Sequence, residues 1–422
     1  MSGLAVAYRA THEAIPLFGV YALLFADRGL STAQISVLLA VWSLSAFLLE
    51  IPSGAWADLL DRRRVLVASG VVYVAAFATW MLWPSFWGFL LGFVLWSCSD
   101  ALHSGTWEAY LFEQLSARGR PHRYARVKAR AESVALVVMA LAIAAAAPLH
   151  QVGGYALVGA ASLGVAVLHV GVTLLLPPPV RGGIPGPAEP RSPAHETSPR
   201  AVAPAPDPGP ADRTPHGWAS TLREGVAQAR AAGPVRRVLL GYAAVVTLVG
   251  FDEYFPLLLA DDGAPVGRVA LAMAGIVLLE ALGTALSDRV ALLTGGRHAA
   301  LVLLAGALLA LGAAGSGWLG AGSLGLGYAL ASSLYVAGDA RLQHAIGQTS
   351  RTRATITSVA GVAGEVGFLV TLATVGLLTL RLELTPVVAG AALVLAVPAA
   401  LAAWRMPAGA AADGPGDAAA DG

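Results

Sequence analysis

Apolar runs about as long as a bilayer is thick recur along the whole chain, and they constrain its fold more than any other feature. A membrane-spanning helix needs about 20 predominantly apolar residues. A spanning strand would need a closed barrel and period-two alternation, which these runs lack. The sequence therefore predicts an all-α membrane protein with twelve transmembrane helices. The expected spans are residues 7–26, 33–56, 65–83, 86–110, 130–148, 155–176, 236–259, 267–287, 299–317, 321–340, 355–378 and 385–404.

The composition agrees with a membrane protein and disfavours several other classes. Charged residues make up 13% of the chain, against about 25% in soluble domains. Lys128, the only lysine, follows no glycine-rich loop, which argues against direct use of ATP. We find no cysteine–histidine cluster with metal spacing and no nucleophile–base constellation. We therefore expect no enzyme, no cofactor and no metal, and a net charge of +1 gives no sign of nucleic-acid binding.

The basic residues predict the orientation in the membrane. With the N-terminus inside, only Arg28, Arg268 and Arg381 fall on the outer side. All other arginines and Lys128 fall in turns, termini or the central loop on the inner side. Because positive residues resist translocation, we expect a multi-pass protein of a bacterial-type plasma membrane with both termini cytoplasmic.

A proline-rich segment divides the chain into two blocks of six spans. Residues 177–215 contain 13 prolines, and such a segment cannot bury a core. We predict four regions: an N-terminal six-helix bundle at 1–176, a cytoplasmic linker at 177–234, a C-terminal six-helix bundle at 235–406 and a disordered tail at 407–422. Within the linker, residues 217–232 show the spacing of a short amphipathic helix.

The two blocks resemble each other in sequence. Glu-x-x-Pro-Leu occurs at residues 13–17 and again at 253–257, in the first and seventh spans. An acidic pair eight residues apart closes the second span and again the eighth, at residues 50 and 58 and at 280 and 288. This order predicts two pseudo-symmetric bundles.

The turn between the second and third spans carries a recognisable motif. It contains Gly54, Asp58 and Asp61, followed by the run Arg62, Arg63 and Arg64. This pattern closely resembles the glycine–aspartate–arginine signature of the major facilitator superfamily. In the fifth span, Ala147-Pro148 followed by Gly153-Gly154 partly resembles a motif of proton-driven exporters in that superfamily. The chain therefore looks like a bacterial drug/proton antiporter.

The resemblance implies an architecture and roles for named residues. Members carry parallel six-helix repeats that rock about a central site, usually as monomers. The signature turn is a conformational latch in the family. The matching residues here are Glu50, Gly54, Asp58, Asp61, Arg62, Arg63 and Arg64, with a weaker second copy at Asp288 and Arg289. Helices one, four, seven and ten line the cavity in the family, which suggests Glu13, Asp100, Asp252, Glu253 and Asp339 as cavity residues.

Ionisable groups inside a membrane are costly and therefore candidates for function. Apolar surroundings favour the neutral form of a carboxylate, so we expect Glu13 to carry the proton, with Glu253 or Asp252 as its partner. Asp100 and His103 lie one turn apart and could hydrogen-bond. The fourth span lacks the arginine that the family often has there, and this shifts the expected proton coupling to Asp100 and His103.

The sequence predicts a secondary transporter that exports small hydrophobic molecules by alternating access. The proton gradient would supply the energy, and the partners would be the substrate, protons and the lipid bilayer. Two alternatives stay open: uptake by proton symport, and a non-transporting sensor that keeps the fold. Aromatic residues could line an apolar cavity for a bulky or cationic molecule, namely Trp42, Trp96, Trp107, Tyr21, Phe251, Tyr254 and Tyr335.

Overall fold

The computed structural model describes residues 1–178, 233–261, 263–346 and 353–406. Within these ranges, the side chains of residues 50–59, 234, 353–355 and 358 lie outside the description. The regular elements in the described ranges are all helices, with no strand among them. The predicted all-α fold is therefore confirmed.

The first half of the chain forms helices as far as residue 174. Its elements are α1 (Ser2–Glu13), η1 (Pro16–Gly19), α2 (Tyr21–Asp27), α3 (Thr32–Leu59), α4 (Arg62–Leu82), α5 (Phe86–His103), α6 (Thr106–Ser116), η2 (Pro121–Arg123) and α7 (Tyr124–Leu174). The long helix α7 covers two predicted spans. Gly153 and Gly154 separate them, because their backbone leaves the helical conformation in the middle of α7. Gly154 has φ of 59°, which favours glycine.

The second half repeats this plan. Its elements are α9 (Gly233–Val249), η3 (Asp252–Tyr254), α10 (Phe255–Asp261), α11 (Val266–Ala285), α12 (Ser287–Ala291), α13 (Gly295–Ala314), α14 (Gly317–Ile346), α15 (Arg353–Leu378) and α16 (Leu384–Trp404). The predicted linker helix at 217–232 and the tail at 407–422 lie outside the described residues, so the domain boundaries stay predictions.

Each of the twelve predicted spans overlaps one or more helices. Nine helical stretches in the described ranges are long and apolar enough to cross a bilayer by themselves. The first predicted span is interrupted after Glu13, the fourth carries Asp100 and His103, and α7 joins two spans in one helix. These three features account for the difference between nine and twelve.

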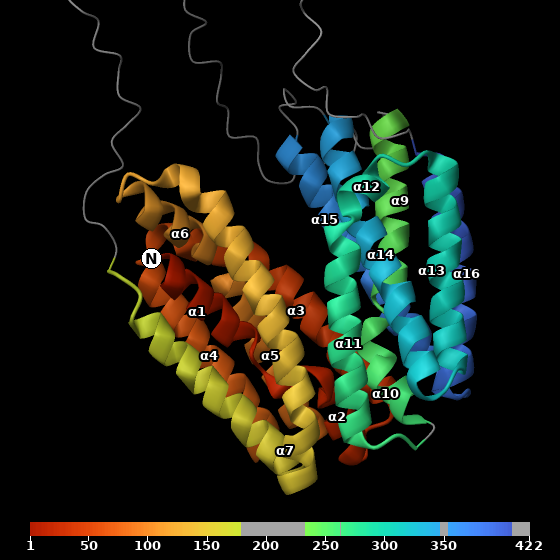
Figure 1. Ribbon diagram of the computed structural model, residues 1–422, viewed down its shortest axis with the longest axis horizontal. Coiled ribbons are helices and arrows are strands. Elements are labelled where there is room, and N and C mark those ends of the chain that lie inside the picture. Colours follow the sequence, from red (N-terminus) through yellow and green to blue (C-terminus); the bar gives the residue numbers. More distant parts are fainter. Residues whose placement is uncertain (179–232, 262, 347–352, 407–422) are drawn as a thin grey trace, which may run out of the picture.

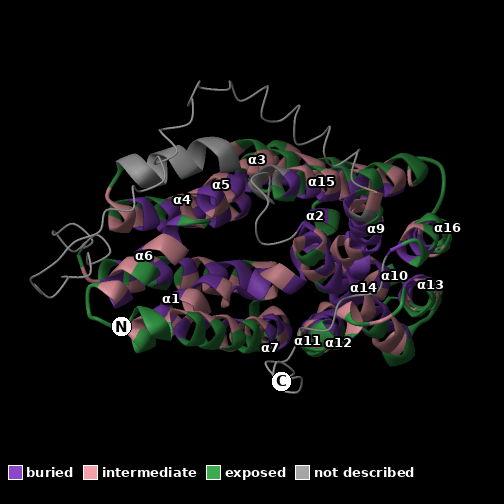
Figure 2. Ribbon diagram, turned by 90° about the horizontal axis from the view of Figure 1, so that it is seen from above, coloured by how far each residue is buried: buried purple, intermediate pink, exposed green. Residues whose placement is uncertain are grey.

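The helices form two groups that diverge towards one side of the molecule. Figure 1 shows α1 to α7 in one group and α9 to α16 in the other, with the groups closest near α2 and α10 and farthest apart near α6 and α12. Figure 2, seen from above Figure 1, shows α3 beside α15 along one edge and α7 beside α11 along the other. Among the described residues, the groups meet mainly at α7 with α11, α3 with α15, α2 with α10, and η1 with α11. We call the two groups the first and the second bundle.

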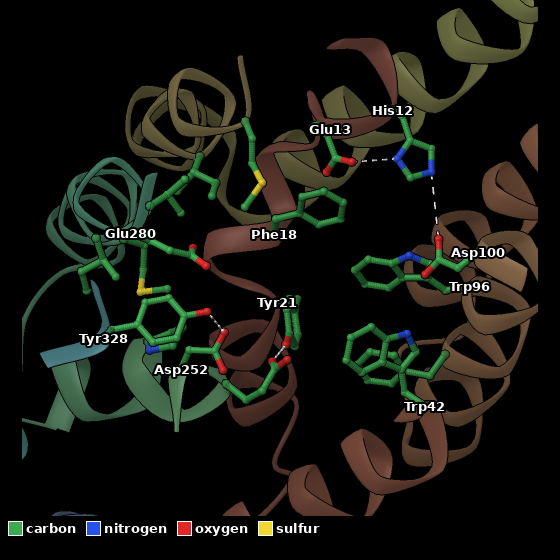
Figure 3. A pocket seen from close by; sticks show the side chains of 18 residues that line it. His12, Glu13, Phe18, Tyr21, Trp42, Trp96, Asp100, Asp252, Glu280 and Tyr328 are labelled. Atoms are coloured by element: carbon green, nitrogen blue, oxygen red, sulfur yellow. Dashed lines mark hydrogen bonds and ion pairs between the residues drawn. The ribbon is translucent and has the colours of Figure 1, made fainter. Parts of the chain in front are cut away.

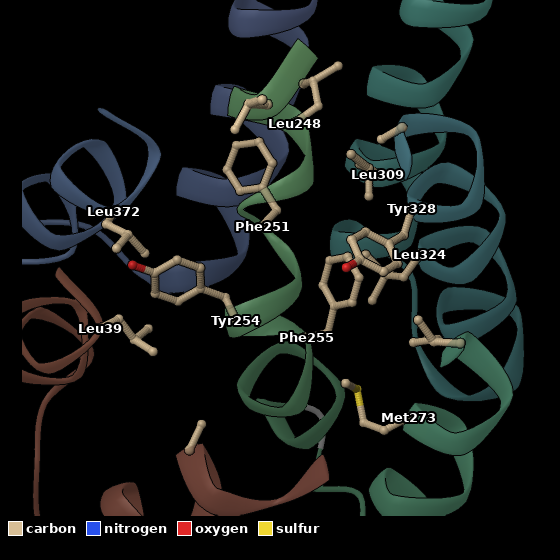
Figure 4. Packing of buried hydrophobic residues seen from close by; sticks show 14 of the residues in the cluster. Leu39, Leu248, Phe251, Tyr254, Phe255, Met273, Leu309, Leu324, Tyr328 and Leu372 are labelled. Atoms are coloured by element: carbon tan, nitrogen blue, oxygen red, sulfur yellow. The ribbon is translucent and has the colours of Figure 1, made fainter. Parts of the chain in front are cut away.

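Apolar packing fixes the contact between the bundles. Tyr254 points from η3 towards Leu39 of α3 and Leu372 of α15, while Phe255 points towards the second bundle's own core (Figure 4). All four side chains named here are buried or nearly so. The turn at Asp252–Tyr254 therefore belongs both to the interface and to the wall of the site described next.

Candidate functional site

Both copies of the Glu-x-x-Pro-Leu motif interrupt a helix. Helix α1 ends at Glu13, and Pro16 starts the short 3-10 turn η1. Helix α9 ends at Val249, and η3 then carries Asp252 and Glu253. Proline has no backbone N–H and clashes with the preceding turn, so it disfavours a continuous helix. The repeat thus places acidic side chains at equivalent helix breaks in the two bundles.

A cavity of about 350 Å³ lies between these two breaks. Figure 3 shows acidic groups on opposite walls, with Phe18 and Tyr21 between them. Its volume suits a drug-sized molecule. The lining residues come from both bundles: His12, Glu13, Phe18, Tyr21, Trp42, Phe93, Trp96, Asp100, Met139, Ile143, Asp252, Glu253, Pro256, Met273, Ile276, Val277, Glu280 and Tyr328.

The lining is acidic. It holds five carboxyl groups, and among the described lining residues the only basic side chain is that of His12. The five are Glu13, Asp100, Asp252, Glu253 and Glu280. Such a wall favours cationic ligands.

On the first-bundle wall, Arg9 joins two carboxylates. Its Nη2 lies 3.0 Å from Glu13 Oε1 and 2.9 Å from Glu132 Oε2, and its Nε donates to Glu132 Oε1 at 3.0 Å. The Arg9 side chain is only 14% exposed. The two-point contact with Glu132 ties α1 to α7.

A cluster of aromatic and imidazole rings surrounds these charges. His12 Nδ1 lies 3.1 Å from Glu13 Oε1, and His12 Nε2 lies 4.0 Å from Asp100 Oδ1. His103 contacts Tyr8 through Nδ1 at 2.8 Å and Arg9 through Nε2 at 3.3 Å. His169 Nδ1 lies 3.0 Å from the Thr11 hydroxyl. Three histidines from three helices therefore meet around the end of α1.

On the second-bundle wall, the acidic side chains have hydroxyl groups as hydrogen-bond partners. Tyr328 donates to Asp252 Oδ2 at 2.9 Å, and Tyr21 of the first bundle donates to Glu253. Ser332 lies 3.5 Å from Glu280 Oε1, at the limit of a hydrogen bond. No ion pair of these three carboxylates with an arginine, lysine or histidine occurs among the described residues. On the opposite wall, by contrast, Glu13 lies within ion-pair distance of Arg9 and His12.

Aromatic rings close the remaining side of the cavity. Trp96 stacks on Phe18 with ring centroids 5.1 Å apart and an interplanar angle of 7°. The Trp96 ring also lies parallel to that of Phe93, with centroids 6.1 Å apart. Trp42 packs against Trp96 with ring centroids 5.6 Å apart. Of the aromatic residues expected in the cavity, Tyr21, Trp42 and Trp96 line it, whereas the lining does not include Trp107, Phe251, Tyr254 or Tyr335.

Four of the six residues predicted for proton coupling or the cavity do line the cavity. They are Glu13, Asp100, Asp252 and Glu253. His103 does not; it lies behind His12, with the two rings stacked at 4.8 Å. Asp339 is exposed and contacts Gln343 Nε2 at 3.4 Å.

The expected hydrogen bond between Asp100 and His103 is wrong. Both ring nitrogens of His103 have other partners, Tyr8 and Arg9. The residue that faces Asp100 is instead His12. A one-turn spacing put both side chains near one face of α5, but α1 packs there and supplies the nearer polar groups.

The predicted latch is described in part. The side chains of Glu50, Gly54 and Asp58 lie outside the described residues. Asp61 caps α4 by accepting a hydrogen bond from the Arg64 backbone N–H at 3.2 Å. Its neighbours bind within the first bundle: Arg62 forms an ion pair with Glu113, and Arg63 Nη2 donates to the Leu174 carbonyl at 2.6 Å. Asp288 and Arg289 are exposed on α12, and the latch role of the whole set stays a prediction.

Sequence reasoning missed part of the site. The arginine pattern places Arg9 at the cytoplasmic side, and nothing in the sequence shows that its mostly buried side chain contacts Glu13 and Glu132. His12 and Glu280 also line the cavity. The signal for His12 and Glu280 was the presence of polar residues within apolar spans, which is the same signal that identified Glu13.

A sequence profile decides the family. The profile of the Major Facilitator Superfamily matches residues 4–370. The chain belongs to the Major Facilitator Superfamily. It is thus a multi-pass membrane protein of a transporter family. No curated protein is significantly similar to it in sequence.

Solved structures share the superfamily fold. The bacterial homolog of the human lysosomal transporter Spinster, inward-facing and unoccupied, is 16% identical, with a TM-score of 0.63 over 96% of this chain and 93% of that one. The nucleoside transporter NupG is 12% identical, with a TM-score of 0.64 and 96% of each chain covered. A bacterial homologue of the iron transporter ferroportin, inward-facing, is 14% identical, with a TM-score of 0.65 over 95% and 97%. At these identities the likeness concerns the fold.

Proposed function

We propose that this superfamily member is a secondary transporter that exports lipophilic, aromatic cations in exchange for protons by alternating access. The observation that carries the proposal is the cavity between the bundles, where five carboxyl groups face one histidine among the described lining residues. A cation is the ligand that such a wall attracts. The stacked Trp96 and Phe18 rings add a surface on which a flat cation gains from cation–π contact.

Exchange follows from competition for the same carboxylates. Asp252, Glu253 and Glu280 have hydroxyl partners, so a bound cation would replace no ion pair there. A proton on one of these groups removes the charge that holds the cation. The cation then binds best to the deprotonated cavity, and this difference in affinity is what couples the two fluxes.

The shape of the molecule supports a site that opens to one side at a time. The bundles are joined near α2 and α10 and diverge near α6 and α12 (Figure 1). By the arginine pattern of the turns, the diverging side is the cytoplasmic one. A cation would enter from the cytoplasm in this conformation, and the inward proton gradient would drive its export.

The test uses purified protein in liposomes with tetraphenylphosphonium as the probe. A pH gradient is imposed, and lumenal pH and probe content are followed together. We expect probe movement coupled to opposite proton movement, reduced by about tenfold or more in Glu253→Gln and in Glu13→Gln. Glu383→Gln is the matched control, because Glu383 is an exposed acidic residue at the start of α16, away from the cavity.

The outcomes distinguish the classes of function. Probe and protons moving in the same direction would replace export with symport. Binding of the probe without proton movement would favour facilitated diffusion or sensing. A Glu383→Gln effect as large as that of Glu253→Gln would remove the assignment to the cavity carboxylates.

A further inference from the structure

His12 lies between two carboxyl groups that belong to different helices. Its Nδ1 is 3.1 Å from Glu13 Oε1 on α1, and its Nε2 is 4.0 Å from Asp100 Oδ1 on α5 (Figure 3). The residue is 7% exposed and lines the cavity. Its Nε2 is buried and makes no hydrogen bond within the described part of the chain. One ring nitrogen is thus engaged while the other faces an acid at a longer distance.

Two flat rings hold the imidazole in this plane. Tyr73 stacks on one side with centroids 4.9 Å apart and an interplanar angle of 8°. His103 stacks on the other side at 4.8 Å and 17°. The Tyr73 hydroxyl also donates to the His12 carbonyl at 3.0 Å. The ring is sandwiched, so its two nitrogens keep pointing at Glu13 and Asp100.

The contacts also fix where the His12 proton lies. Glu13 pairs with Arg9 at 3.0 Å and is therefore the ionised form, which only accepts hydrogen bonds. Arg9 Nη1, a donor, also lies 3.5 Å from His12 Nδ1, but the shorter contact of 3.1 Å is with the Glu13 acceptor and favours a hydrogen on Nδ1. In the neutral ring this leaves the Nε2 lone pair facing Asp100. The imidazole is ready to accept a proton at Nε2 and to donate one from Nδ1.

We propose that His12 relays protons between Asp100 and Glu13. This inference rests on the proposed function and deepens it. A proton that has entered from the cavity on the Asp100 carboxyl group passes to Nε2 and leaves Asp100 ionised. The Nδ1 proton passes to Glu13, which becomes neutral. His12 is neutral before and after, with its proton moved from Nδ1 to Nε2, and the reverse transfer resets it.

The charged groups around His12 show which ion pair the relay would affect. The titratable and charged groups around the ring are Arg9 and Glu13 on α1, Tyr73 on α4, Asp100 and His103 on α5, and His169 on α7. Neutralising Glu13 removes one of the two carboxylate partners of Arg9, the other being Glu132. The relay thus connects proton arrival at the cavity with the ion pair that joins α1 to α7.

The gap at Asp100 sets when the relay operates. A distance of 4.0 Å is longer than a hydrogen bond. Rotation of the Asp100 side chain, or one bridging water, closes it. The step at Glu13 is already within hydrogen-bond reach. In this conformation, the relay is therefore interrupted only between His12 and Asp100.

Nitrogen-15 NMR of the histidines in the full-length protein in nanodiscs tests the geometry without any substrate. His12→Gln and His12→Asn both identify the His12 signal among the nine histidines. We expect the neutral ring to carry its proton on Nδ1 in the wild type and in Asp100→Ala. We expect a switch to Nε2 in Glu13→Ala, because Nδ1 loses its acceptor. A proton on Nε2 in the wild type, or no switch in Glu13→Ala, overturns the relay.

Transport of tetraphenylphosphonium tests the consequence. In His12→Gln, we expect gradient-driven transport to fall about tenfold or more, and to fall further than exchange of labelled probe at equal pH, which needs no net proton transfer. His298→Gln is the control, since His298 is also buried but lies in α13, outside the cavity. Unchanged gradient drive in His12→Gln overturns the relay. Absence of coupled movement in the wild type overturns the proposed function instead, and the NMR result separates the two failures.

Discussion

Tyr21 in the first bundle donates a hydrogen bond to Glu253 in the second, on the wall of the cavity. The next residue, Tyr254, pairs with Ser36 of α3 at 2.7 Å between the hydroxyl oxygens. The turn at Asp252–Tyr254 thus supplies cavity carboxylates. It also holds the bundles together on the side where α2 and α10 meet, which we call the closed side. In the proposed transport cycle, a cation or proton at Glu253 would compete with Tyr21, which would link occupancy of the cavity to closure of this side.

Replacing Tyr21 with Phe should weaken the closed side. A hydrogen bond to a charged group is worth about 1.5–3 kcal/mol, so the population with this side open should rise about tenfold or more. The measurement is the distance distribution between spin labels at Arg28→Cys and Arg268→Cys, in a Cys98→Ser background. Both label sites are exposed on the closed side. Tyr242→Phe, which removes a hydroxyl pair inside the second bundle, should leave the distribution unchanged.

The Arg9–Glu132 pair predicts a stability effect. Glu132→Gln leaves Arg9 with Glu13 as its carboxylate partner. The free energy of unfolding should fall by about 1–3 kcal/mol, because the Glu132 side chain is 37% exposed and its charge is partly screened. Thermal unfolding in detergent should show a lower midpoint, by several degrees. Glu108→Gln is the comparison, since the Glu108–Lys128 pair is more exposed and should contribute less than about 1 kcal/mol. Equal midpoints for the two variants would contradict this ranking.

Much of the fold was predictable because long apolar runs leave few alternatives in a bilayer. The same logic identified Glu13, Asp100, Asp252 and Glu253, since ionisable groups are rarely kept in a span without a partner or a cavity. The repeat located the helix breaks that carry three of them, Glu13, Asp252 and Glu253. These conclusions need only local sequence and the properties of the membrane.

Side-chain direction was not predictable, because it depends on how each helix is rotated against its neighbours. Asp339 sits in an expected cavity helix, yet it is exposed. Arg9 looked like a cytoplasmic charge, yet it meets Glu132, 123 residues away along the chain. His12 replaces His103 as the neighbour of Asp100 for the same reason. A single sequence does not encode such contacts in any local pattern.

Trp96 should contribute to binding of aromatic cations. Its stacking on Phe18 presents a fixed aromatic surface in the cavity. Trp96→Ala should weaken tetraphenylphosphonium binding by about 1–2 kcal/mol, or about tenfold, and Trp96→Phe should lose less. Equilibrium dialysis with labelled probe measures the affinity. Trp87→Ala on the same helix is the control, because Trp87 is 64% exposed and outside the cavity; a comparable loss there would refute a specific role for Trp96.

Two glycines of α11 should respond oppositely to alanine. A Cβ at Gly283 would lie 2.3 Å from the Ala329 carbonyl oxygen of α14, whereas a Cβ at Gly275 would meet nothing within 4 Å. Because the contact at Gly283 is with backbone, relief requires α11 and α14 to separate, and overpacking of this kind costs about 1–3 kcal/mol. Gly283→Ala should therefore lower the unfolding midpoint. Gly275→Ala should leave it unchanged or raise it slightly, since alanine is favoured over glycine in a helix by about 0.5–1 kcal/mol.

Helix α11 also supplies Glu280 to the cavity, so Gly283→Ala should weaken probe binding as well. A Gly283→Ala protein with wild-type stability would mean that α11 and α14 are not held at the close approach seen here.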